Sequence, residues 1–368
     1  MNLPGHQIAV VAATAKSARR LAGALTLLLL CQGLSAPAQP AAPPTLWYIP
    51  PSNLKAPKGY IRDADFPQLF AEPVTWPDAL RRVGVFGMPS SYITKAADED
   101  LRRAFAFLNA HHIALAVEWP VVDGTVNGRG EGVEGVIHHP HFSQKIAQRL
   151  KLLNAHLDYL ETDEPLCFGH YFKQGRSVVP GGPERIGCQY AIDDVAVQAA
   201  GAIREVRAVY PGLKVVETEP VCGVGSPAEF SQWLAALKKN LGDIPLAGVD
   251  LDVQWERAWQ APSVALVDAI RQSGLSYGLI VDGGPHDATD RSWVEHAQHN
   301  LDEWNRLIPV PPGRLRFQSW HERPSHVLPE TSPETMLSLI NAWAAAHPEP
   351  APPASVSNHL GEKLPSPP

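Results

Sequence analysis

Residues 246–254 read Leu-Ala-Gly-Val-Asp-Leu-Asp-Val-Gln, and from Val249 onward apolar and polar side chains alternate strictly. Successive side chains of a β-strand point to opposite faces, so Asp250, Asp252 and Gln254 share one face of this strand. The opposite, apolar face fits against a layer of helices, which leaves the polar face toward the interior. Because a buried carboxylate is costly unless it is paired, this polar face requires a chemical explanation.

Other short runs rich in Val, Ile, Leu and aromatic residues have the length of buried strands. They are Leu46–Pro50, Val83–Met88, Ile113–Trp119, Leu157–Asp163, Lys214–Glu219, Tyr277–Asp282 and Leu315–Trp320. Stretches with helical periodicity separate them, at Asp98–Ala110, Ser143–Ala155, Asp193–Val209, Pro227–Leu241, Pro262–Gln272, Arg291–Leu307 and Pro333–Ala346. With residues 246–254 as a strand, this alternation predicts a single (β/α)8 TIM barrel. A doubly wound open sheet is the alternative, but no G-x-G-x-x-G opens a helix after the first strand.

Residues typical of helix ends occur in the spacers. A capping hydroxyl, a Pro in the first turn and a nearby acid occur at Thr75–Asp78, Ser226–Glu229 and Thr331–Glu334. Gly242 and Gly274 stand where two of the helices should end. These positions predict where individual helices of the barrel begin and stop.

The two ends of the chain differ from its middle. Basic residues precede the apolar run 21–30, and small residues follow it up to Ala38. This order is typical of a secretory signal, so we expect a periplasmic or secreted protein. The Pro-rich far end has almost no large apolar side chains and is expected to be disordered. The predicted organisation is a signal peptide (1–38), a Pro-rich linker (39–45), a barrel domain (46–347) and a disordered Pro-rich tail (348–368).

Charge and composition exclude some classes of partner. The chain has 368 residues and a formal net charge of −7, from 31 basic and 38 acidic side chains. Nucleic acids and membrane surfaces are bound by basic faces, so we expect no nucleic-acid partner. No internal apolar run reaches the ~18–20 residues of a membrane span. We expect a monomer without membrane contact once the signal is cleaved.

Acidic side chains gather where the predicted strands end. Active sites of (β/α)8 barrels lie at this end and take residues from several strands. One Asp or Glu alone is commonly a helix cap or an ion-pair partner, but acids on a series of adjacent strands predict a functional cleft. The set is Glu118, Asp163, Glu164, Glu217, Glu219, Asp250, Asp252 and Asp282, and the eighth strand adds Gln318, Trp320 and His321.

Several carboxylates beside aromatic side chains fit carbohydrate chemistry. Glycoside hydrolysis uses two acids that flank the bond, one protonated and one ionised. Neighbouring carboxylates push their pKa values apart, which supplies both states at one pH. Trp119, Trp255, Trp259 and Trp320 fall at or just beyond strand ends, where they could stack on sugar rings or simply pack in the core. Export also suits a polysaccharide substrate.

The tetrapeptide Thr162-Asp163-Glu164-Pro165 resembles the Asn-Glu-Pro signature on the fourth strand of the large clan of (β/α)8 glycoside hydrolases. The resemblance implies that Glu164 is the general acid/base and that Trp320 floors a sugar subsite. The chain departs from the clan at Asp163, where Asn is usual. It also has only Asp282 where the seventh strand should end in a nucleophilic Glu. This second departure favours an inverting over a retaining mechanism.

Two broader resemblances involve the same strands. The run Gly248–Asp252 resembles the D-x-D strand of chitinase-like hydrolases, although it lies on the sixth predicted strand and not the fourth. Residues 83–340 resemble an uncharacterised family of secreted bacterial glycosidase-like barrels. The shared motifs are Asp-Glu-Pro, Glu-Pro, Asp-x-Asp and Gln-Ser-Trp-His.

The loops carry weaker signals. Cys167 and Cys188 bracket a loop after Asp-Glu-Pro, and in an exported protein they predict a disulfide, with Cys222 left over and buried. The glycine-rich stretch Gly124–Gly135 could form a cleft wall, a lid or a plain loop. The histidines at 138–141 lack a second cluster with zinc spacing, so no metal is expected there.

Together these patterns predict an exported glycoside hydrolase without a cofactor. Glu164 is the expected general acid, with Glu219 or Asp252 as the base or nucleophile. The expected substrate-binding residues are Glu118, Asp163, Glu217, Asp250, Trp255, Asp282, Gln318, Trp320 and His321. Two alternatives remain open: a sugar isomerase or epimerase barrel that holds Mg²⁺ or Mn²⁺ through carboxylates, and a non-catalytic carbohydrate-binding barrel.

Overall fold

The computed structural model describes residues 43–51, 65–175 and 184–348. The predicted signal peptide and most of the predicted linker lie outside the described residues. So does nearly all of the predicted tail. Within the described part of the chain, no helix has both the length and the apolar character that crossing a bilayer requires.

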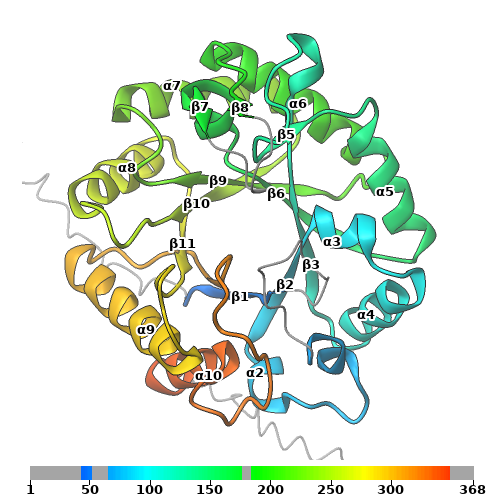
Figure 1. The fold of residues 1–368 in the computed structure, drawn as a ribbon, viewed down its shortest axis with the longest axis vertical. Coiled ribbons are helices and arrows are strands. Elements are labelled where there is room, and N and C mark those ends of the chain that lie inside the picture. Colours follow the sequence, from blue (N-terminus) through cyan, green and yellow to red (C-terminus); the bar gives the residue numbers. More distant parts are fainter. Residues whose placement is uncertain (1–42, 52–64, 176–183, 349–368) are drawn as a thin grey trace, which may run out of the picture. The chain divides into compact units, whose positions relative to one another are not determined.

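Eight parallel strands close into a barrel, which confirms the predicted (β/α)8 fold (Figure 1). In chain order they are β1 (Thr45–Ile49), β2 (Val83–Pro89), β3 (Ala114–Trp119), β6 (Leu157–Thr162), β9 (Lys214–Pro220), β10 (Leu246–Asp252), β11 (Tyr277–Val281) and β12 (Arg314–Gln318). Each strand pairs with its neighbours in chain order, and the first strand pairs with the last, Tyr48 opposite Phe317. Every strand lies at its predicted place, within a few residues at each end.

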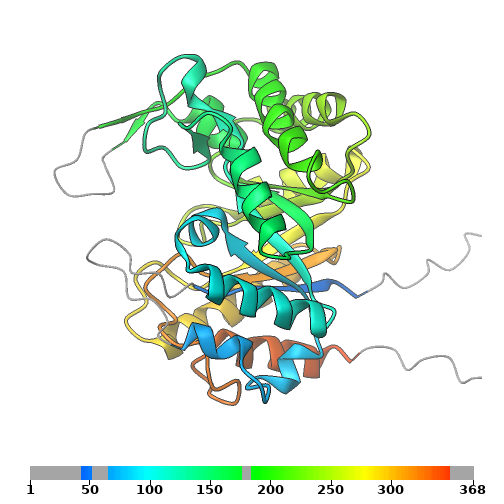
Figure 2. The ribbon, with the colours of Figure 1, turned by 90° about the vertical axis from the view of Figure 1, so that its right-hand side faces the viewer.

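Helices cover the outside of the barrel between successive strands (Figures 1 and 2). They are α2 (Pro77–Leu80), α3 (Ser90–Lys95), α4 (Asp98–Ala110), α5 (Phe142–Leu152), α6 (Ile192–Arg207), α7 (Pro227–Leu241), α8 (Gln260–Gln272), α9 (Asp290–Leu307) and α10 (Met336–Ala346). Short turns of other helix types are η1 (Phe66–Phe70), η2 (Gly124–Val126) and η3 (Cys167–Tyr171). The buried side of α4 shows the pattern, since Leu101, Phe105 and Leu108 recur at helical spacing and face the core.

The predicted helix starts are confirmed in part. Ser226 and Glu229 form a reciprocal capping box at the start of α7, as their spacing indicates. Thr75 does not cap α2, because its hydroxyl donates to the carbonyl of Gln68. The predicted start near Thr331 is also wrong: α10 begins later and is capped by Thr335.

Small paired strands fix two loops above the barrel. β4 (Val122–Asp123) pairs with β5 (Val136–Ile137), and β7 (Gln174–Gly175) pairs with β8 (Arg185–Ile186). The first pair brackets the glycine-rich loop after β3. This loop is therefore anchored at both of its ends.

The interior of the barrel has an apolar layer and a charged layer. Trp47, Val85, Ala116 and Val216 form a separate apolar cluster there. Close by, Arg314 and Arg316 of β12 pair with buried carboxylates of β6 and β10. Only Gly fits at position 278, since a Cβ there would lie 2.0 Å from Oδ1 of Asp250. The polar alternation of residues 246–254 is thus explained by paired charges inside the barrel.

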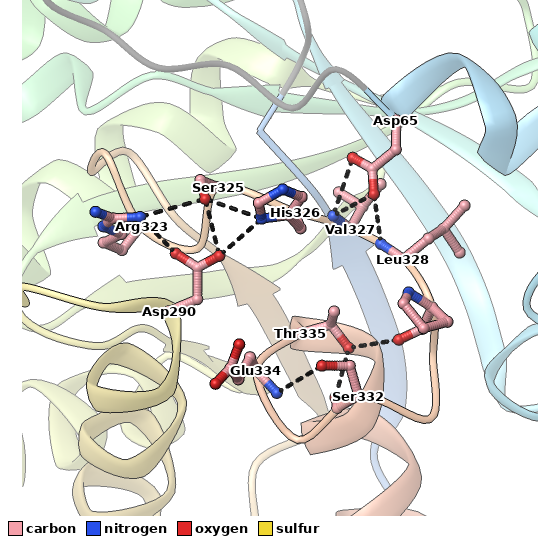
Figure 3. A network of polar contacts seen from close by, with 11 residues as sticks. Asp65, Asp290, Arg323, Ser325, His326, Val327, Leu328, Ser332, Glu334 and Thr335 are labelled. Carbon is pink, nitrogen blue, oxygen red and sulfur yellow. Dashed lines mark hydrogen bonds and ion pairs between the residues drawn. The ribbon is translucent and has the colours of Figure 1, made fainter.

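The segment from Ser319 to Thr335 connects β12 to α10 and is held by two carboxylates (Figure 3). Asp290 accepts hydrogen bonds from Arg323 at 3.1 Å and from Ser325 at 2.9 Å. Asp65 accepts the backbone N–H of Leu328 at 2.9 Å. These contacts fix the part of the segment that follows Trp320 and His321, the two aromatic side chains just after β12.

Candidate active site

A pocket of about 320 Å³ opens at the carboxyl ends of the strands. Five acids dominate its lining, and they come from four segments that are distant in the sequence. The lining residues are Glu118, Glu134, Thr162, Asp163, Glu164, Thr218, Asp252, Trp320 and His321. The structure thus brings together six of the predicted site residues, and it adds Glu134, Thr162 and Thr218.

Glu164 lies two residues after the end of β6, in an unusual backbone conformation. Its φ of 48° is in the left-handed region, which a non-glycine residue adopts rarely. Pro165 follows and disfavours a right-handed helical conformation at Glu164. Loss of hydration and the surrounding acids, Asp252 first among them, raise the pKa of Glu164 well above its usual value.

Asp252 ends β10 and shares a hydrogen bond with the carboxyl group of Glu164. Burial raises the pKa of Asp252 to about 6 and the charge of Asp282 adds to the rise, while the bond to Glu164 and the positive charges of Arg316 and His321 oppose it. Glu164 has acids around it, whereas Asp252 also has cationic neighbours. The environment therefore favours a proton on Glu164 and a charge on Asp252.

The glycine-rich loop forms one wall of the pocket. Asp163 accepts the backbone N–H of Gly135 at 3.0 Å, and a Cβ at Gly135 would lie 2.1 Å from the carbonyl oxygen of Asp163. Burial and the charges of Glu118 and Glu134 raise the pKa of Asp163 well above its usual value. Loss of hydration, and after it the charges of Glu118 and Asp252, raises the pKa of Glu134 to about 7, an effect that solvent weakens because the side chain of Glu134 is exposed.

Arg316 forms the floor beneath the pocket and is fully buried. Its guanidinium lies 2.6 Å from Oε2 of Glu161 and 3.0 Å from Oε2 of Glu118. Glu118 also accepts a hydrogen bond from Gln318 at 3.1 Å. Gln318 therefore acts beneath the pocket, where it holds Glu118, and does not line it. Arg316 and Glu161 are absent from the sequence-based set, although each alternates with a predicted site residue on its own strand.

Glu217 and Glu219 face the helices and not the interior, which corrects their predicted place. Their register partners on β10 are the helix-facing residues Val249 and Leu251. Glu217 accepts a hydrogen bond from Trp233 of α7 at 2.9 Å. Glu219 accepts the backbone N–H groups of residues 166 and 167, at 2.5 and 3.0 Å. With both oxygens engaged outside the pocket, Glu219 is not placed to activate water or attack a sugar.

Two further acids are buried partners and not pocket residues. Asp250 accepts a hydrogen bond from Nε of Arg314 at 2.7 Å, deep in the barrel. Asp282 has Trp293 on one oxygen at 2.9 Å and His321 on the other at 3.3 Å. Neither carboxylate is free to contact a substrate directly.

Trp255 is also not placed as predicted. Its ring packs edge-on against Trp259 and Trp304, with centroids 5.0 and 6.3 Å away. Trp119 is fully buried and donates to Ser143 at 3.1 Å. Of the tryptophans named from the sequence, only Trp320 lines the pocket.

The predicted disulfide between Cys167 and Cys188 is wrong. Cys167, Cys188 and Cys222 are all free thiols. Cys188 lies against the glycine-rich loop, where its thiol contacts the carbonyl of Arg129 at 3.6 Å. Cys167 begins η3, close to Glu219, and burial raises the pKa of its thiol.

No group of three or more His, Cys, Asp or Glu side chains in the described ranges has the arrangement of a metal site. The acids of the pocket instead contact one another, Arg316 and backbone N–H groups. The isomerase alternative, which needs carboxylates converging on one Mg²⁺ or Mn²⁺, therefore has no ligand set in this part of the chain.

The buried acids predict that stability falls as pH rises. Burial raises the pKa of Glu161 to about 8, of Glu217 to about 7 and of Asp252 to about 6. The unfolded chain releases these protons first, so it binds fewer protons than the folded state between about pH 4 and pH 8. The free energy of unfolding should drop by about 1.4 kcal/mol per proton and per pH unit. Urea unfolding at several pH values within this window measures the slope.

Glu217→Gln is the matched variant for this measurement, because its amide oxygen can still accept from Trp233. It should flatten the fall in stability at higher pH. Greater stability at pH 8 than at pH 5 in the parent chain would contradict the expectation.

Comparisons with known proteins do not identify a family. No protein-family model and no curated protein matches the chain. A psychrophilic glycoside hydrolase family 10 endo-β-1,4-xylanase aligns at a TM-score of 0.43 and 12% identity, over 78% of this chain and 88% of that one. Xylanase 10B from Thermotoga maritima aligns at a TM-score of 0.43 and 10% identity, over 75% of this chain and 84% of that one.

Barrels of another chemistry align comparably. A phosphoribosyl anthranilate isomerase from Thermococcus kodakaraensis aligns at a TM-score of 0.39 and 11% identity, over 83% of this chain and 99% of that one. The activity has to be argued from the pocket itself.

Proposed function

We propose that the chain is a glycoside hydrolase that cleaves a polysaccharide or oligosaccharide with Glu164 and Asp252. The observation that carries the proposal is the hydrogen-bonded pair of carboxyl groups in an open pocket, with acids around one member and cations near the other. Two carboxyls of unequal pKa are the minimal catalytic set for this reaction.

The two groups divide the work as follows. Glu164, protonated, donates its proton to the glycosidic oxygen as the bond to the anomeric carbon breaks. Asp252, ionised, forms a bond to the anomeric carbon from the opposite face. Water then attacks that carbon, gives a proton to Glu164 and releases Asp252, so both carboxyls return to their starting states.

The close contact between the two carboxyls favours retention of configuration. Inverting enzymes keep their acids ~6.5–9.5 Å apart to admit a water, whereas retaining enzymes keep them ~5–5.5 Å apart. Two neighbouring carboxyls fit the shorter spacing better, and their contact must open when a sugar ring enters between them. We therefore replace the inversion favoured by the sequence with a retaining proposal, in which the nucleophile comes from β10 and not from β11.

The rest of the pocket supplies binding. Trp320 offers an aromatic face on which a sugar ring can stack, and Glu118 and Asp163 can accept hydrogen bonds from hydroxyls. We also propose that the protein acts in the periplasm or outside the cell, because its sequence has a segment like a secretory signal. We further propose that it acts as a monomer.

A polysaccharide panel with detection of new reducing ends tests the function. We expect at least one substrate to be cleaved by the parent chain and not by Asp252→Asn, with the first product in the configuration of the substrate. NMR of the anomeric proton reads that configuration. An inverted first product would overturn the retaining mechanism, and no cleavage of any panel member would overturn the proposed function.

A further inference from the structure

Among the described residues that line the pocket, His321 is the histidine. Its ring is held by a buried acid, Asp282. His321 follows β12 by three residues, and its Nε2 lies 3.3 Å from Oδ2 of Asp282. Asp282 follows β11 directly and is 4% exposed. Since Trp293 donates to the other oxygen at 2.9 Å, Asp282 is a fixed partner for the imidazole.

The backbone around His321 is fixed as well. Its N–H donates to the hydroxyl of Ser319 at 3.2 Å, and that hydroxyl donates to the carbonyl of Arg323 at 2.6 Å. Arg323 in turn pairs with Asp290, as Figure 3 shows. Contacts to both the ring and the backbone of His321 therefore fix its position at the edge of the pocket.

The strongest charges on His321 are negative. They belong to Asp282, directly after β11, and to Asp252 and Glu256 at and beyond the end of β10. Burial alone would lower the pKa of His321, but these three acids raise it above its usual value. The imidazole is therefore charged over more of the physiological pH range than a free histidine.

The strongest charges on the two catalytic carboxyls differ. Arg316 and His321 stabilise the ionised form of Asp252, against the opposing charge of Asp282. The strongest charges on Glu164 are those of Asp252, Glu134, Asp163 and Glu219, all of them acids. The surroundings thus favour the proton on Glu164 and the charge on Asp252. Of the two cations, His321 is the one that can itself titrate near neutral pH.

We propose that His321, held by Asp282, is a positioning residue that keeps Asp252 ionised and leaves the shared proton on Glu164. The inference rests on the proposed function for the roles of the two carboxyls, and it adds what assigns those roles. A coupled pair of acids without such a neighbour would share its proton between both members.

NMR titration of the resting protein tests this without any substrate. Ring-labelled histidine and carboxyl-labelled aspartate report each midpoint, and the spectra of His321→Gln and Asp252→Asn identify the two signals. We expect Asp282→Asn to lower the midpoint of His321, and His321→Gln to raise the midpoint of Asp252, each by about one pH unit.

The matched control is His296→Gln. His296 pairs with Asp287 at 2.5 Å, but it is exposed and does not line the pocket, so this variant should leave the midpoint of Asp252 unchanged. An unchanged His321 midpoint in Asp282→Asn, or an unchanged Asp252 midpoint in His321→Gln, would overturn the inference. Expected shifts in a protein that cleaves no panel member would leave the charge pairing standing and remove the proposed function. Cleavage of a panel member without the expected shifts would leave the proposed function standing and overturn the role of His321.

Discussion

Glu164→Gln lowers kcat/KM on an unactivated oligosaccharide by about 10²–10⁴-fold, the usual contribution of a general acid. The amide has nearly the same shape, so the fold and the contact with Asp252 are retained. What is lost is the proton that must reach the leaving oxygen. Initial rates on the substrate found in the panel measure the loss.

The leaving group separates this role from a structural one. An aryl glycoside with an acidic phenol needs little protonation, so bond cleavage in Glu164→Gln should be impaired far less on that substrate. Asp252→Asn should be inactive on both substrates, because the attacking carboxylate is missing. Equal losses on both substrates in Glu164→Gln would contradict the assignment of Glu164.

Glu322→Gln is the control for these measurements. Glu322 is an exposed acid beside His321, and it does not line the pocket. The same substitution of an amide for a carboxyl group is made, but outside the pocket. Rates close to those of the parent chain are expected on both substrates.

Arg316→Met destabilises the fold by about 3–5 kcal/mol, because it leaves buried carboxylates without their counter-charge. Glu118, Glu161 and Asp250 all lie within 4.0 Å of the guanidinium. Met fills a similar volume, so the loss reports charge more than packing. Urea unfolding near pH 7 gives the difference in the free energy of unfolding.

Two controls make this result specific. Arg306→Met removes an exposed arginine, 71% accessible and paired with Glu303, and should cost less than about 1 kcal/mol. Adding Glu118→Gln to Arg316→Met removes one of the stranded charges and should restore part of the stability. The cost of Arg316→Met should also be smaller at pH 5, where the carboxyls take up protons. A cost below that of Arg306→Met would show that the floor is not held by charge.

The strands could be predicted from sequence because their apolar runs are short, separated and bounded by helix-start residues. Which side chains of a strand point into the barrel could be predicted only where every second residue is apolar. Residues 249–254 meet this condition, and Asp250 and Asp252 do point inward. Residues 214–220 do not, because Thr218 and its neighbouring glutamates give both faces polar candidates. The register with β10 decides which face is inside, and that contact is not local.

The same limit explains the residues that sequence reasoning missed. Arg316 and Glu161 each lie two positions from a predicted site residue, but their role follows only from their contact with each other across the barrel. Glu134 lies on a loop whose position depends on the pairing of β4 with β5 and on the contact of Gly135 with Asp163. The predicted disulfide failed for a related reason, since spacing along a loop does not fix the direction of two thiols.

The closure of β1 on β12 has a consequence for how the chain acquires its fold. Glu118, Glu161 and Asp250 precede their shared arginine in the sequence by 66 residues or more, counting from Asp250 to Arg316. A ribosome therefore completes most of the barrel strands before the guanidinium that neutralises them exists. Until then these carboxyls stay hydrated or protonated, and the inner layer cannot close around them. The barrel should accordingly assemble late and as one unit, and chains that end before β12 should be open and prone to proteolysis.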